Sequence, residues 1–133
     1  MKNILYIVLS LSVVAGLHFS GALESFNLTH PIWRSNATLY GSLAGGALSA
    51  LIFWACAAKP RLGRWLERLV MLGFVAALLL TLLSAKTFID AAAYNADAVN
   101  LWHKGSYIVF ITFVAGVAAL LAKLRIIGSH SRG

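Results

Sequence analysis

Titratable side chains gather near one end of the hydrophobic segments in this sequence: His18, Glu24, Lys86, Asp90 and His103. Ionisable residues in a membrane are functional candidates, because lipid makes their charges costly. Lys86 and Asp90 are four residues apart, a spacing that lets them pair along one helix face. His18 and Glu24 would adjoin that pair if their helices touch. We interpret these five residues as a candidate cluster, either a structural polar plug or a site for a ligand or a proton.

The histidines give little indication of a metal centre. His18, His30 and His103 show neither the HxxxH nor the ExxH spacing that places two ligands on one helix face. The sequence also lacks the GxSxG and HExxH motifs of hydrolases. We therefore expect no metal, no cofactor and no catalysis. The alternative left open is a haem held between His18 and His103, which requires both residues at one depth on facing helices.

Hydrophobic runs supply the elements that would position this cluster. The chain of 133 residues is 60% hydrophobic and only 11% charged, and soluble domains are about 25% charged. Four runs of about 20 residues match a hydrocarbon core of about 30 Å; they cover residues 4–23, 39–58, 69–89 and 107–127. Backbone amides in lipid must be paired within the segment, so each run is expected to be helical. The predicted fold is all-α, a four-transmembrane-helix bundle formed by residues 1–133 as one domain.

The first run also has features of a secretory signal peptide. Lys2 precedes the apolar stretch, and Ser20-Gly21-Ala22 resembles a cleavage site. His18 interrupts the end of the run, so we expect a retained span rather than a cleaved leader.

Basic residues predict the orientation of the helices. Lysine and arginine concentrate in the cytoplasmic segments of membrane proteins. Eight of the eleven fall on one predicted side, namely Lys2, Lys59, Arg61, Arg64, Arg68, Lys123, Arg125 and Arg132. Both termini are therefore expected in the cytoplasm of a bacterial cell, with the protein in the inner membrane. The five-residue cluster would face the periplasm, and the cytoplasmic half of the bundle is expected to be nearly all apolar.

The segment 59–68 is predicted to be a short cytoplasmic loop. Pro60 and Gly63 indicate its turn. Arg64, Trp65 and Arg68 are interpreted as headgroup anchors in preference to a specific lipid site.

Small residues recur at four-residue spacing and predict the faces on which helices pack. The packing positions are Gly16 in the first run, Gly41, Gly45 and Ser49 in the second, and Gly73 and Ala77 in the third. Packing within one bundle is the first interpretation, and contact between copies is the alternative. The second run is the better candidate for an oligomer face, because Gly45 and Gly46 leave it smooth.

These patterns favour a non-catalytic protein that works through helix association, as an accessory, assembly or immunity-type subunit. A pore or carrier usually shows a polar stripe through the span or a broken helix at midplane, and neither pattern is seen in the cytoplasmic half. The alternative is a small oligomeric transporter or channel with a periplasm-facing polar vestibule. The expected partners are the lipid bilayer and either a membrane protein or a second copy. Nucleic acid is not expected, because the basic residues lie at the ends of apolar runs.

Overall fold

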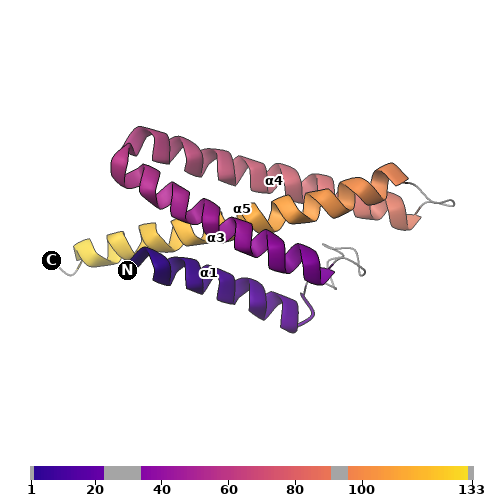
Figure 1. Cartoon of the computed structure of the whole chain (residues 1–133), viewed down its shortest axis with the longest axis horizontal. Coiled ribbons are helices and arrows are strands. Elements are labelled where there is room, and N and C mark those ends of the chain that lie inside the picture. The colour runs from indigo at the N-terminus through magenta and orange to yellow at the C-terminus, as the bar shows by residue number, and fades with distance from the viewer. Residues whose placement is uncertain (1, 23–33, 91–95, 132–133) are drawn as a thin grey trace.

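The computed structural model describes residues 2–22, 34–90 and 96–131, and these residues form four helices (Figure 1). The helices are α1 (Lys2–Phe19), α3 (Arg34–Ala58), α4 (Pro60–Asp90) and α5 (Ala96–Ser131). Among the described residues, three segments are long and apolar enough to cross a membrane: Asn36–Ala58, Pro60–Asp90 and Ala96–Leu124. The apolar part of α1, Ile4–Phe19, is shorter. The all-helical fold is therefore confirmed, and three helices have the length and composition of membrane spans.

The first helix ends sooner than the expected run to residue 23. The helix ends at Phe19, where the Ser20 amide donates to the Gly16 carbonyl at 3.0 Å. Gly21 has a φ of 80°, a left-handed conformation that glycine adopts without a Cβ clash. Helix α1 therefore ends before the apolar run does.

The prediction of a loop at residues 59–68 is wrong. Lys59 alone separates α3 from α4, because α4 already begins at Pro60. Proline suits the first position of a helix, where its missing N–H has no helical partner to lose. Gly63 lies inside α4, where an added Cβ would stand 2.5 Å from the Cys56 sulfur and 2.6 Å from the Cys56 Cα. This glycine therefore permits close contact between α3 and α4 instead of forming a turn.

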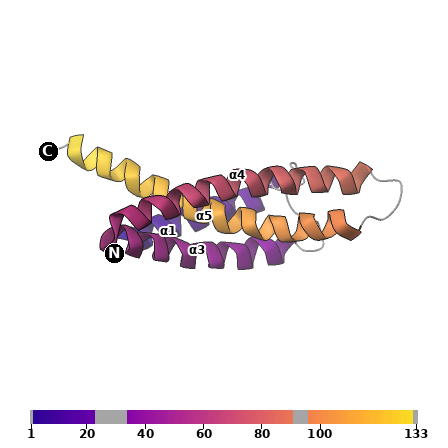
Figure 2. The same cartoon turned by 90° about the horizontal axis from the view of Figure 1, so that it is seen from above.

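The bundle has two distinguishable ends. The start of α1, the α3–α4 junction at Lys59 and the end of α5 lie together at one end, which we call the junction end (Figures 1 and 2). The end of α4 and the start of α5 lie at the opposite, far end. The first and last helices thus have their outer termini on the same side of the molecule.

Helices α3 and α5 are the central elements, since each of them contacts the three other helices. One core cluster joins Val14 of α1, Ala37 of α3, and Phe110 and Val114 of α5. A second cluster joins α3, α4 and α5 through Ile52, Val70 and Ala115. Each cluster draws on three helices, so the two clusters together hold the four helices as one bundle.

Small residues of α3 and α4 lie against α5. A Cβ added to Gly41 would stand 2.8 Å from the Cβ of Phe110, and one added to Gly45 would stand 2.7 Å from the Cβ of Val114. Gly73 of α4 faces the Thr112 methyl group of α5, and Ser49 and Ala77 are buried in the bundle. Contact between copies through Gly45 would require displacing α5.

Helix α1 packs with a different face from the expected one. Tyr6, Ser10 and Val14 are buried, and the Ser10 hydroxyl donates to the Val114 carbonyl of α5 at 2.7 Å. Gly16 is exposed and has nothing within 4 Å of an added Cβ, so it takes no part in packing within the described bundle. The buried positions recur every fourth residue, as one ridge of a helix does.

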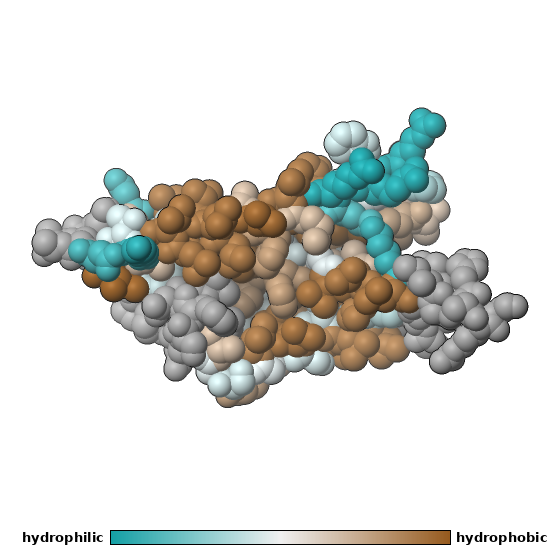
Figure 3. Space-filling model, turned by 180° about the vertical axis from the view of Figure 1, so that it is seen from behind, coloured by the Kyte–Doolittle hydropathy of each residue, from teal (hydrophilic) through white to brown (hydrophobic). Residues whose placement is uncertain are grey.

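Large hydrophobic side chains cover the middle of the surface. Leu72 and Leu83 of α4 are 69% and 61% exposed. Figure 3 shows an apolar band across the face seen from behind, with hydrophilic groups towards both ends. Soluble monomers rarely expose continuous apolar areas of this kind. The band is the surface that a bilayer would cover.

Candidate functional site

The far end contains the charged residues that the sequence indicated, but the expected charge pair is not formed. Lys86 and Asp90 are both exposed near the end of α4. No ion pair joins them in the described part of the chain, where the ion pair found is that of Glu67 and Lys123. An exposed pair at a helix end gains little energy in water. Glu24, the remaining acidic member of the cluster, lies outside the described residues.

The two histidines lie on different helices and in different surroundings. His18 is half-buried at the end of α1, with its ring edge-on to Phe19 at a centroid distance of 5.2 Å. His103 is half-buried in α5, edge-on to Tyr107 at 5.1 Å. Helices α1 and α4 share no contact. The arrangement in which His18 would adjoin Lys86 and Asp90 is therefore not formed.

His18 borders a cavity of about 420 Å³ whose walls come from α1 and α3. Its lining is mostly apolar, including Leu11, Val14 and Leu43. Two buried polar atoms on this wall, Nδ1 of His18 and Oγ of Ser42, have no hydrogen-bond partner among the described residues. Buried polar atoms normally have partners. A small polar group entering the cavity could therefore be held there.

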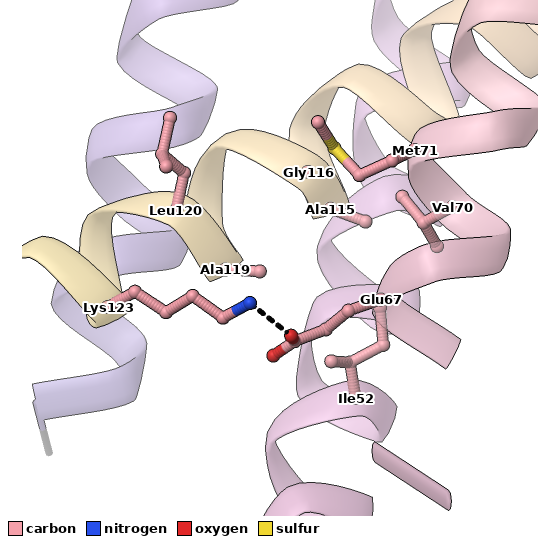
Figure 4. A pocket seen from close by; sticks show the side chains of 9 residues that line it. All are labelled: Ile52, Glu67, Val70, Met71, Ala115, Gly116, Ala119, Leu120 and Lys123. Carbon is pink, nitrogen blue, oxygen red and sulfur yellow. Dashed lines mark ion pairs between the residues drawn. The ribbon is translucent and has the colours of Figure 1, made fainter. Parts of the chain in front are cut away.

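A polar group that joins three helices lies at the junction end. Nζ of Lys123 is 2.6 Å from Oε2 of Glu67, and the pair joins α5 to α4 (Figure 4). The Cys56 thiol of α3 donates to Oε1 of Glu67 at 3.5 Å. Glu67 is only 15% exposed, whereas Lys123 is 60% exposed. Three helices thus meet around one carboxylate at this end of the bundle.

This ion pair borders two hollows. A small cavity of about 90 Å³ lies on its apolar side, lined by Ile52, Val70 and Ala115 among others (Figure 4). A larger cleft of about 450 Å³ is lined by Arg64, Glu67, Arg68, Met71, Leu72 and Lys123. Glu67, Met71 and Lys123 border both hollows. The pair therefore stands between an apolar interior and a basic cleft.

Sequence reasoning missed Glu67 because it treated residues 59–68 as a loop of anchors. A signal was present: Glu67 is one of only four acidic residues, and it sits between Arg64 and Arg68. An acid kept inside a basic segment suggests a specific partner. The identity of that partner, Lys123, could be learned only from the packing of α4 against α5.

Known proteins give no further indication. No protein-family model matches the chain, and neither a curated protein nor a solved structure is significantly similar to it. Among the described residues, no group of three or more His, Cys, Asp or Glu side chains is placed to hold a metal ion. The function must therefore be argued from the geometry of this chain alone.

Proposed function

We propose that the chain is a four-span protein of a bacterial inner membrane, with both termini in the cytoplasm. It acts without catalysis, as an accessory subunit that binds a transmembrane helix of a partner protein. Three helices long enough to span support the membrane location. The apolar part of α1, residues 4–19, would be about 24 Å long, and a bilayer can adapt to such a span by local thinning. The basic junction end supports the orientation, because lysine and arginine favour the cytoplasmic side.

The observation that carries the proposal is the outward face of α1. Ser12 and Gly16 are exposed, and no atom lies within 4 Å of a Cβ added to Gly16. The Ser12 hydroxyl bonds to the Val8 carbonyl of its own helix, so it does not tie α1 to the bundle. Small residues let two helix backbones approach in lipid, where close packing drives association. The corresponding small residues of α3 are already covered by α5.

Site-specific photo-crosslinking in cells tests this proposal. A crosslinking amino acid at position 12 should give a discrete adduct with another membrane protein, and Gly16→Leu should abolish that adduct. The same amino acid at position 79 is the matched control, because Leu79 is 57% exposed on α4, away from α1. Adducts with lipid alone, or equal adducts from both positions, would overturn the proposal. Adducts with a second copy of this chain would replace the accessory role with self-association.

A second candidate, a small transporter or channel, is favoured by the cavity between α1 and α3. His18 and Ser42 both present buried polar atoms there. Proton flux into proteoliposomes, driven by a potassium gradient with valinomycin, tests this candidate. A flux above that of empty vesicles, lost in His18→Leu, would support it. A flux equal to that of empty vesicles would exclude proton conduction.

A further inference from the structure

The cleft at the junction end has an unusual distribution of charge. Arg64, Glu67, Arg68, Met71 and Leu72 follow the three- and four-residue spacing of a single α4 face, and Lys123 of α5 closes the opposite wall. Three cationic side chains thus line the cleft together with one carboxylate. Because Glu67 is already paired with Lys123, the two arginines give the cleft its net positive charge.

Neither arginine has an acidic partner in the described ranges. Arg64 and Arg68 are exposed, and the ion pair found there engages Lys123 instead. They are four residues apart on one helix, so their guanidinium groups lie on the same face. Guanidinium groups bind phosphate oxygens through two parallel hydrogen bonds. The part of the cleft that these two arginines line is therefore complementary to a phosphate group.

The part of the cleft that Met71 and Leu72 line is complementary to a hydrocarbon chain. These two side chains are 53% and 69% exposed and lie one helical turn after Arg68, towards the middle of α4. The apolar surface continues down α4 through Val75, Leu79 and Leu83, which are also exposed. A phosphate bound at the arginines would therefore place an attached acyl chain along this strip.

We propose that this cleft binds an anionic phospholipid, with the phosphate at Arg64 and Arg68 and an acyl chain along Met71 and Leu72. The Glu67–Lys123 pair forms the wall of the cleft between α4 and α5. Basic pockets between transmembrane helices are the usual sites for anionic headgroups. The site is separate from the outward face of α1, so either proposal can fail without the other.

Native mass spectrometry of the purified protein in nonionic detergent tests the site. The probes are phosphatidylglycerol and phosphatidylcholine with the same acyl chains. We expect tighter binding of phosphatidylglycerol, since each arginine near an anionic lipid contributes about fivefold in affinity. Arg64→Gln with Arg68→Gln should weaken phosphatidylglycerol binding about 25-fold and phosphatidylcholine binding by a much smaller factor, because the choline cation offsets the charge of its phosphate. Both arginines are exposed, so the thermal midpoint should not move.

Arg61→Gln is the matched control for a single charge. Arg61 is exposed near the start of α4 but does not line the cleft, so this variant should bind like the wild type, whereas Arg68→Gln alone should lose about fivefold. Equal loss in these two variants would show attraction by overall charge and overturn the proposal. Equal binding of the two lipids would also overturn it. Inorganic phosphate that binds as tightly as phosphatidylglycerol would show that the acyl chain adds nothing to binding, which also contradicts the proposal.

Discussion

Glu67 of α4 and Lys123 of α5 form an ion pair with 2.6 Å between Oε2 and Nζ, at the point where α3, α4 and α5 meet. The carboxylate is largely covered, whereas the ammonium group still reaches the surface. Losing one partner of such a pair leaves the other with its full desolvation penalty. The pair therefore fixes the position of α5 against α4 more strongly than its exposed lysine would suggest.

Lys123→Met should destabilise the bundle by roughly 1–3 kcal/mol, because Glu67 would remain covered without a cation. Lys123→Met combined with Glu67→Gln should recover much of that loss, since no unpaired charge remains. The measurement is equilibrium unfolding in mixed micelles. Lys104→Met is the control, an exposed lysine of the same helix; an equal effect in the control would contradict the role of the pair.

Gly63→Ala should open the α3–α4 junction, because the new Cβ would stand 2.5 Å from the Cys56 sulfur and 2.6 Å from its Cα. Overpacking of this kind costs about 1–3 kcal/mol. Gly16→Ala provides the comparison: it meets open space and should raise helix stability by up to about 1 kcal/mol. Thermal unfolding followed by circular dichroism should shift the two variants in opposite directions. Equal midpoints would show that α3 and α4 are not in close contact at Gly63.

Ser10→Ala should weaken the attachment of α1 to α5, because the Ser10 hydroxyl donates to the Val114 carbonyl at 2.7 Å. Hydrogen bonds between membrane helices contribute about 0.6–2 kcal/mol. Ser12→Ala removes a hydroxyl that bonds within its own helix, so its effect should be below about 0.5 kcal/mol. Limited proteolysis of α1 in detergent reports the difference. Faster cleavage of Ser12→Ala than of Ser10→Ala would place the wrong face of α1 against the bundle.

Lys86→Met should leave the free energy of unfolding within about 0.5 kcal/mol of the wild type, as exposed positions without partners usually do. Lys86 and Asp90 are both exposed and are not joined by an ion pair. Unfolding of Lys86→Met, Asp90→Leu and the double variant measures any coupling between the two positions. A coupling energy above about 1 kcal/mol would show that Lys86 and Asp90 do form the pair that the sequence suggested.

The sequence alone was sufficient to predict that the fold is all-helical. Each apolar run satisfies its own backbone, so run length and composition predict a helix without knowledge of neighbours. The boundaries were less accurate where a single residue decides them. Helix α1 ends just before Gly21, although the apolar run continues to residue 23, and α4 begins at Pro60, inside the expected loop.

The contacts between helices were decided by the tertiary structure. A helix in lipid is apolar on the face that meets lipid and on the face that meets a neighbouring helix, so hydropathy does not distinguish Ser10 from Ser12 or Gly45 from Gly46. Glu67 and Lys123 are far apart in the chain, and their pairing depends on the packing of α5 against α4. The sequence thus determined that the apolar runs are helical and where the basic residues concentrate. Only the folded bundle decided which side chains meet, because in lipid that choice depends on close packing rather than on polarity.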